Sequence, residues 1–296
     1  MPRLPACNGA PAGCPLREVE RDLFGRVAVV KADAGTLPDS RGQRGLAGRC
    51  GPRGGVGMIE AHLAKLRARD DISAEEERAI RDSFSEFKEY PADQTFITRG
   101  EELDHSTLLI EGLMCRYKDL RNGERQVTEL HVAGDFADLH SFTLKRLDHH
   151  MMTLTPCTVG ILPHENLTRI TERYPHLTRV YWFSTNLDAA IHREWAVSLG
   201  RRDALARTAN LFCELHVRLR IVGLTDANSY HLDLTQADLA ECLGLTSVHV
   251  NRMLKELRER ELLEFRAGTV TILNLPELER VAEFDPAYLY LERRPR

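Results

Sequence analysis

The stretch LTQADLAECLGLTSVHVNRMLKELRE, residues 234–259, contains two short helical patterns separated by a single glycine. Thr235 can cap the first helix, and Asp238 stands three residues later, where a capping box places its acid. Thr246 can cap the second helix by the same mechanism. The stretch therefore predicts two helices with defined starting points, joined by a very short turn.

Three residues at fixed offsets set how these two helices would meet. Ala240 lets the helices approach closely, Gly244 supplies the positive φ that a tight turn needs, and Val250 packs the second helix against the first. Leucines and one methionine supply the remaining buried faces. This combination predicts a helix-turn-helix. The charged residues of the second helix would, by themselves, favour an ordinary solvent-exposed helix face. Only the spacing of Ala240, Gly244 and Val250 favours a DNA-binding helix-turn-helix.

The N-terminal end of the second helix would be the part that enters the major groove of DNA. Its exposed positions are Ser247, Val248, His249, Asn251 and Arg252. Arg252 can form a bidentate contact with guanine, Asn251 can pair with adenine, and Val248 can contact a thymine methyl. The residues expected to contact phosphates, which position a protein without reading sequence, are Thr235, Thr246, Lys255, Arg258 and Arg266.

The segment LLEFRAGTVTILNL, residues 262–275, follows the second helix and contains two short strand-like runs joined by Ala267-Gly268. A hairpin at this place is a wing. The sequence from Arg201 to the end, 201–296, is accordingly predicted to be a winged helix-turn-helix domain that binds double-stranded DNA.

Bulk composition limits the other possibilities. The chain has 296 residues, 43% of them hydrophobic, which predicts about two domains. A net charge of −4 excludes a uniformly basic coat, so DNA binding must come from a local group of basic side chains. There is no apolar run of roughly 18 residues and no signal-peptide pattern, so we expect no membrane contact and a cytoplasmic location. The seven cysteines are then expected to be reduced thiols.

Residues 1–57 are rich in glycine and arginine and lack an apolar period, so we expect a disordered prefix. From Met58 onward the sequence shows amphipathic patterns and then short alternating apolar runs. Residues 58–173 are therefore expected to form a compact antiparallel β-roll. Asn122-Gly123, between two alternating runs, gives the strongest hairpin signal in this segment.

A long helix is predicted over residues 174–200, where Pro175 is acceptable at the first helical position. A narrow apolar stripe runs along it and is predicted to be a dimer interface; its members are Leu177, Val180, Leu187, Ile191 and Trp195. The alternative is that the stripe packs only against the chain's own β-roll. The overall prediction is an α+β fold of jelly-roll-like β-roll, dimerisation helix and winged helix-turn-helix.

This order of parts, with the corner AGDF (133–136), the helix start ERYPHL (172–177) and the segment 234–265, resembles the Crp/Fnr family of bacterial transcription regulators. The resemblance implies a homodimer on a two-fold symmetric operator, with RNA polymerase as a partner and a signal sensed by the β-roll. Arg252 matches the base-reading arginine of the family, whereas Val248 replaces its usual glutamate. The known half-site sequences should therefore not be transferred.

Other departures concern the signal. Family members that bind cyclic AMP hold its phosphate with a Gly-Glu pair and an Arg-Ser pair; here Ala137-Asp138 and His149-His150 occupy these places, which argues against cyclic AMP. Lys145 and Arg146 are basic, so an anion other than cyclic AMP stays an alternative signal. An iron–sulfur cluster is also disfavoured because the candidate N-terminal thiols, Cys7, Cys14 and Cys50, are widely spaced.

The effector stays unidentified at this point, with Asp138, His140, His149 and His150 as candidate effector residues. One alternative is a haem- or metal-dependent sensor that uses the region of His131, His140 and the adjacent pair His149-His150, which we place on a loop. Another is a regulator that needs no ligand. No His-x-His, Walker, G-x-S-x-G or H-E-x-x-H motif occurs, so we expect no catalytic activity.

Overall fold

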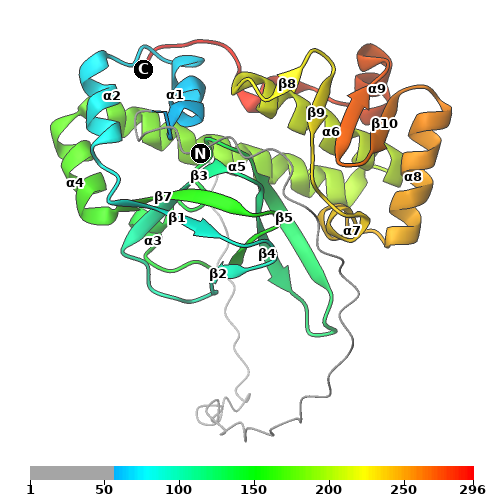
Figure 1. The fold of residues 1–296 in the computed structure, drawn as a ribbon, viewed down its shortest axis with the longest axis horizontal. Coiled ribbons are helices and arrows are strands. Elements are labelled where there is room, and N and C mark those ends of the chain that lie inside the picture. Colours follow the sequence, from blue (N-terminus) through cyan, green and yellow to red (C-terminus); the bar gives the residue numbers. More distant parts are fainter. Residues whose placement is uncertain (1–56) are drawn as a thin grey trace, which may run out of the picture. The chain divides into compact units, whose positions relative to one another are not determined.

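The computed structural model describes residues 57–296 (Figure 1). The expected disordered prefix therefore lies outside the described residues, except for Gly57. Among the residues described, no helix is both long enough and apolar enough to cross a membrane.

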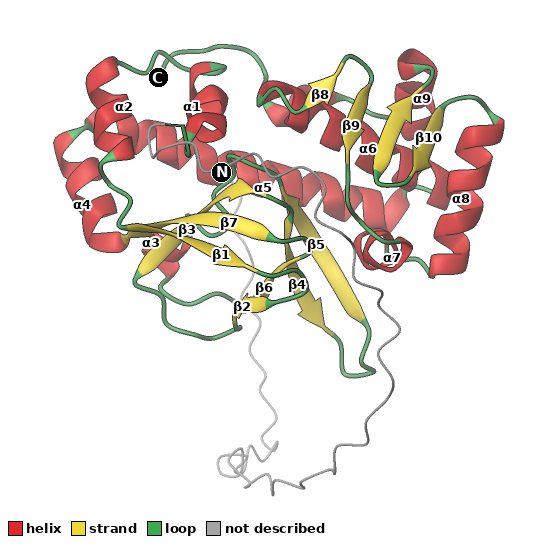
Figure 2. Ribbon diagram, in the orientation of Figure 1, coloured by secondary structure: helices red, strands yellow, loops and turns green. Residues whose placement is uncertain are grey.

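Two antiparallel sheets form the β-roll, with strand orders β1-β7-β3 and β2-β6-β4-β5 (Figure 2). The strands are β1 (Glu86–Tyr90), β2 (Thr95–Ile97), β3 (His105–Glu111), β4 (Met114–Asp119), β5 (Arg125–His131), β6 (His150–Thr153) and β7 (Cys157–Pro163). The hairpin predicted at Asn122-Gly123 is confirmed: Gly123 has φ of +86° and joins β4 to β5. The extended pairing of this hairpin places the end of β5 beside the later helices.

Two helices precede the roll, one short helix lies between β5 and β6, and two follow the roll. They are α1 (Glu60–Arg67), α2 (Ala74–Arg81), α3 (Ser141–Leu144), α4 (His164–Arg173) and α5 (Pro175–Arg201). Helix α5 has 27 residues and carries its proline at the start, as the sequence predicts. It ends where Arg202 becomes extended, and Asp203 then caps the next helix. The chain thus turns between two long helices within very few residues.

The C-terminal part consists of helices around a small antiparallel sheet with strand order β10-β11-β9-β8. Its elements are α6 (Ala204–Ile221), β8 (Thr225–Asp226), β9 (Ser229–His231), α7 (Gln236–Leu243), α8 (Ser247–Glu259), β10 (Leu263–Arg266), β11 (Thr269–Ile272), α9 (Leu275–Ala282) and the 3-10 helix η1 (Pro286–Leu289). Together, α7, α8 and the β10–β11 hairpin form the predicted winged helix-turn-helix. The α+β fold expected from the sequence is therefore confirmed.

The hydrophobic core is continuous between the β-roll and the C-terminal helices. Val127 and Leu130 of β5 belong to the same buried cluster as Phe212 of α6 and Leu239 of α7. A separate cluster joins α1, α2 and α4 to the first half of α5. The roll and the helix-turn-helix consequently share packing in this conformation.

The apolar stripe on α5 is buried within its own chain, which corrects its assignment as a dimer interface. Leu177 and Val180 pack in the cluster with α1, α2 and α4, while Ile191 and Trp195 pack in the larger core and Leu187 lies against it. Leu177, Val180, Ile191 and Trp195 are at most 7% exposed and leave little surface for a second chain, whereas Leu187 is half-buried. An apolar stripe of this kind can be buried either by the same chain or by a second chain, and the sequence does not distinguish these two possibilities.

A group of buried charges connects α1, the β-roll and α6. Asp135, just after β5, forms ion pairs with Lys65 of α1 at 2.5 Å and with Arg218 of α6 at 2.8 Å. Arg218 also pairs with Glu214 at 2.9 Å, and Glu214 accepts a hydrogen bond from the Trp195 indole. We call Lys65, Asp135 and Arg218 the Asp135 triad.

Candidate nucleic-acid interface

The first helix of the interface, α7, begins with a complete capping box. The Thr235 hydroxyl accepts a hydrogen bond from the Asp238 backbone N–H at 3.1 Å, and the Asp238 carboxylate accepts one from the Thr235 N–H at 2.7 Å. Thr246 caps α8 by accepting from the His249 N–H at 3.3 Å. Both predicted caps are confirmed, and each satisfies backbone groups that the helix itself leaves unpaired.

The turn between the helices depends on its glycine. Gly244 lies in the left-handed region with φ of 59° and ends α7. Ala240 is buried, and Val250 is completely buried on the inner face of α8. This arrangement fixes the angle between α7 and α8 and determines which face of α8 points outward.

The outward face of α8 carries the five residues predicted to read bases. Ser247, Val248, His249, Asn251 and Arg252 are all exposed, and Val248 has 78% of its surface accessible. A branched apolar side chain this exposed at the start of a helix is available to contact a partner. The inner face, in contrast, is formed by buried Val250, Met253 and Leu257.

Basic side chains around α8 differ in how far they are already paired. Lys255 lies 3.6 Å from Glu259, Arg266 of the wing lies 2.6 Å from Glu264, and Arg260 pairs with Glu256. All of these pairs are exposed and contribute little to stability. Within the described part of the chain, Arg252 and Arg258 form no ion pair, so these two guanidinium groups are the most readily available for an anionic partner.

The wing is the β10–β11 hairpin, in which Arg266 pairs with Thr269. Ala267 and Gly268 occupy its tip, both with positive φ. Arg266 and Thr269 are exposed. The hairpin therefore presents one exposed basic side chain, Arg266, next to its tip.

A side chain of the β-roll contacts the helix-turn-helix directly. The Gln126 amide of β5 donates to the Glu241 carbonyl at 2.9 Å, at the C-terminal end of α7. Arg207 of α6 donates to the Leu243 carbonyl at 2.6 Å. These bonds satisfy carbonyl groups that the end of a helix leaves without partners, and they couple the position of α7 to β5.

The candidate effector residues do not form one group. His140 and His149 lie together with ring centroids 5.6 Å apart. His150 belongs to strand β6, not to a loop as predicted from the sequence, and it stacks on Tyr117. His149 lies in the bend just before this strand and contacts Asp148 and His140, so the two adjacent histidines have different neighbours.

Asp138 is fully buried and accepts a hydrogen bond from the Thr107 N–H at 2.5 Å. Burial raises the pKa of its carboxyl to about 7. This carboxyl is enclosed by the roll and is not presented at its surface. Its burial also corrects the assignment of Asp138 as a residue in contact with an effector.

Sequence reasoning missed a cluster made by Glu129 and His131 of β5 with Asp188 of α5. The first two residues were visible as a Glu-x-His pattern on a strand, since residues two apart share a face. The contribution of Asp188 depends on how α5 crosses the sheet, which the local sequence does not specify.

Taken together, the two-sheet roll, the long helix and the exposed recognition helix with its wing define a DNA-binding transcription regulator. Comparison with known families agrees: the cyclic nucleotide-binding domain matches residues 87–174, and the Crp-like helix-turn-helix domain matches residues 206–281. The chain belongs to the Crp/Fnr family.

Curated relatives are regulators of the same type. The fumarate and nitrate reduction regulatory protein of Vibrio cholerae is 25% identical over 189 residues, covering 64% of this chain and 75% of the relative. The transcriptional activator protein FnrL of Cereibacter sphaeroides is 29% identical over 189 residues, covering 62% and 74%. In fold, the chain is similar to FixK2 of Bradyrhizobium japonicum, with a TM-score of 0.61, 22% identity and coverage of 66% and 96%.

Proposed function

We propose that the chain is a sequence-specific transcription regulator that binds a two-fold symmetric operator as a homodimer, under control of a signal at the β-roll. The observation that carries the proposal is the exposed N-terminal end of α8, where Arg252 stands without an ion pair among the described residues. Ser247, Val248, His249, Asn251 and Arg252 read base edges in this proposal. The phosphate contacts come from Thr235, Thr246, Lys255, Arg258 and Arg266.

The proposed dimer interface uses the exposed face of α5 in place of its buried stripe. Trp182, Asn186, Arg193 and Val197 recur at four- and seven-residue steps, which keeps them on one side of the helix. Trp182 is 68% exposed, and Val197 is 51% exposed. Large apolar side chains on one exposed face support association with a second copy, in which two recognition helices reach half-sites ~34 Å apart.

In this proposal each predicted segment has one role. Residues 58–173 sense the signal, residues 174–200 form the dimer interface and residues 201–296 bind DNA. DNA as the proposed partner supports a cytoplasmic location. RNA polymerase is a further proposed partner, supported by a relative that is named a transcriptional activator. We propose no catalytic step.

Cyclic AMP is not the proposed signal. His149 stands where the family's Arg-Ser pair supplies positive charge, and burial together with the nearby Arg116 lowers its pKa to about 4, so it is neutral. Burial is also the main reason that the pKa of neighbouring His140 is lowered to about 3. An iron–sulfur cluster would need the N-terminal cysteines, which lie outside the described residues.

The DNA-binding proposal can be tested with a duplex enriched from a random pool by the full-length protein. Binding is measured by fluorescence anisotropy at fixed salt against a scrambled duplex. Arg252→Ala should weaken binding to the enriched duplex by about 1–3 kcal/mol and relax selectivity at one base pair. The matched control is Arg280→Ala, which removes the same charge from exposed α9. Equal binding of enriched and scrambled DNA by the wild type would refute the base-reading assignment.

The dimer proposal has a separate test. Trp182→Glu should convert the protein from dimer to monomer in light scattering coupled to size-exclusion chromatography, because it places a charge in the proposed seam. Arg280→Glu, which places the same new charge on an exposed position of α9 and leaves α5 unchanged, is the control. A dimer that persists in the Trp182 variant would rule out this face.

A further inference from the structure

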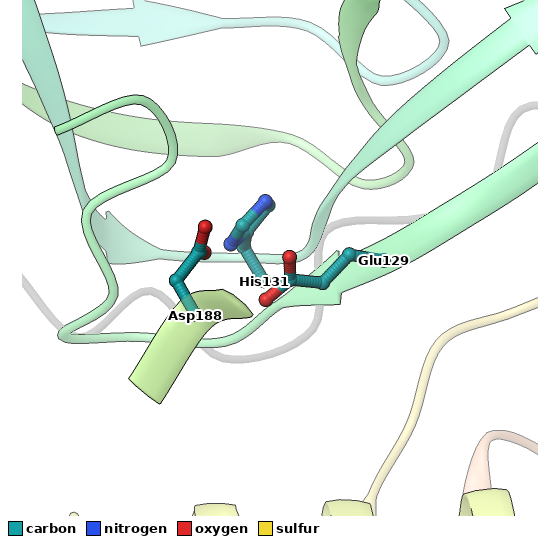
Figure 3. Close-up of side chains that lie close together, drawn as sticks. All are labelled: Glu129, His131 and Asp188. Atoms are coloured by element: carbon teal, nitrogen blue, oxygen red, sulfur yellow. The ribbon is translucent and has the colours of Figure 1, made fainter. Parts of the chain in front are cut away.

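Three side chains from two separate elements converge beside the β-roll (Figure 3). Glu129 and His131 extend from the same face of β5, and Asp188 reaches toward them from α5. One ligand atom from each lies within 4.8 Å of the other two. The cluster borders a cavity of about 80 Å³ enclosed by residues of α1, β5, α5 and α6.

His131 is the unusual member of this cluster. Its side chain is completely buried, and neither ring nitrogen has a hydrogen-bond partner among the described residues. Leaving a buried polar atom without a hydrogen bond destabilises the fold, so native proteins rarely retain one without a reason. Burial lowers the pKa of His131 well below its ordinary value, which keeps the ring neutral and its lone pair available.

The two carboxylates retain free oxygens. Arg116 donates to Glu129 Oε2 at 3.0 Å and to Asp188 Oδ2 at 2.8 Å. His192 Nδ1 also lies 2.9 Å from Glu129 Oε2. Within the described chain, these contacts leave Glu129 Oε1 and Asp188 Oδ1 without hydrogen bonds.

Arg116 lies against both carboxylates of the cluster. Two carboxylates taken out of water need a compensating positive charge; the buried guanidinium supplies it for Asp188, whereas burial and the Asp188 charge still raise the pKa of Glu129. Burial works to raise the pKa of Asp188, but Arg116 outweighs it and brings that pKa to about 2. Asp188 is therefore ionised at neutral pH and ready to act as a ligand.

We propose that Glu129, His131 and Asp188 form a binding site for a divalent first-row transition-metal ion such as Zn²⁺. One neutral imidazole with two carboxylates suits these ions, whereas Mg²⁺ and Ca²⁺ prefer oxygen ligands alone. Ligand atoms about 2.1 Å from a tetrahedral ion lie about 3.4 Å apart, so any pair of these atoms near the 4.8 Å limit would move closer together on binding. His140, whose Nδ1 is 4.0 Å from Asp188 Oδ2, is the nearest candidate for a further ligand.

Such an ion would tie β5 to α5. Glu129 and His131 are fixed in the sheet, while Asp188 sits midway along the long helix. Contraction of the site would draw this part of α5 toward the roll. If the proposed DNA-binding function holds, metal occupancy should therefore change DNA affinity; metal binding itself does not depend on that function.

The test uses the full chain in a background where Cys7, Cys14 and Cys50 are replaced by serine, so that N-terminal thiols cannot bind the metal. Isothermal titration with Zn²⁺ should show one site per chain, and Mg²⁺ should show none. His131→Leu and Asp188→Asn should each weaken Zn²⁺ binding by more than about tenfold, the smallest loss typical even of outer-shell partners. His150→Leu is the matched control, because His150 stacks on Tyr117 instead of joining the cluster.

His131→Leu removes an unsatisfied buried group, so this variant should fold, and thermal unfolding followed by circular dichroism checks that it does. Co²⁺ provides a second readout: its visible absorption bands should be lost in folded His131→Leu and kept in His150→Leu. Unchanged Zn²⁺ affinity in both cluster variants, or no binding by the parent protein, would overturn the proposal.

DNA binding to the enriched duplex, measured with Zn²⁺ and with a chelator, separates the two proposals. Metal binding without selective DNA binding would refute the proposed function alone. Selective DNA binding without a metal site would refute this inference alone.

Discussion

Replacing Asp138 by asparagine should stabilise the protein, and increasingly so as the pH rises. The carboxyl is fully buried, and burial raises its pKa from 3.8 to about 7. Between these values the folded chain holds a proton that the unfolded chain has released, so the folded state loses stability as pH increases. A gap of about three pKa units corresponds to about 4 kcal/mol at the upper end of this window.

Asparagine imitates the protonated acid and can still accept the hydrogen bond from the Thr107 N–H. Urea unfolding at pH 4, 6 and 8, followed by tryptophan fluorescence, measures the effect. The Asp138→Asn variant should match the wild type near pH 4 and exceed it by up to about 4 kcal/mol at pH 8.

Asp148→Asn is the control for this experiment. Lys118 and His149 lower the pKa of the exposed Asp148 carboxyl, so its replacement should give no gain at pH 8. The reasoning fails if Asp138→Asn is no more stable than the wild type at pH 8, or if its advantage is the same at every pH.

Three further predictions concern the triad and the DNA-binding surface. Asp135→Asn leaves Lys65 and Arg218 without their shared carboxylate and should lower stability by about 3 kcal/mol, seen by calorimetry as a melting point about 6–12 °C lower. Burial works to raise the pKa of Asp135, but Lys65 and Arg218 outweigh it and hold that pKa below its ordinary value. The loss of stability in the variant should therefore shrink as the pH falls below about 4. A melting point within 1 °C of the wild type at pH 7 would contradict the role of the triad. Lys255→Ala and Arg258→Ala should weaken binding to all sequences alike and reduce the slope of log affinity against log salt by about 1, and an unchanged slope would remove them as phosphate contacts. Gly244→Ala forces an L-residue into φ of 59° and should cost about 1–2 kcal/mol in chemical unfolding, whereas stability equal to the wild type would show that the turn relaxes.

Local sequence signals predicted the parts of this fold that local physics determines. Thr235, Thr246 and Gly244 each act through backbone groups a few residues away, and the Asn122-Gly123 hairpin depends on the φ angles of its own turn. These features could be predicted without knowing the tertiary structure. For the same reason, the position of the recognition helix within the sequence and its exposed face were accessible in advance.

Features that depend on packing between distant segments could not be predicted in this way. The stripe containing Leu177 and Trp195 required an apolar neighbour, but its periodicity did not say whether that neighbour was a second chain or the same one. Asp188 meets Glu129 only because α5 crosses the end of β5. The sequence predicts a loop for both adjacent histidines, whereas His150 is the first residue of β6 because it pairs with Tyr117 of β4.

The shared core between the β-roll and the C-terminal helices has a practical consequence for dissecting this protein. A C-terminal fragment that starts at α6 would uncover Phe212 and Leu239 on the side where Val127 and Leu130 pack. The complementary N-terminal fragment would carry the other half of the same apolar surface. Separately expressed halves should therefore tend to aggregate, and recovery of soluble material on co-expression would show that the two fragments reassemble through this surface.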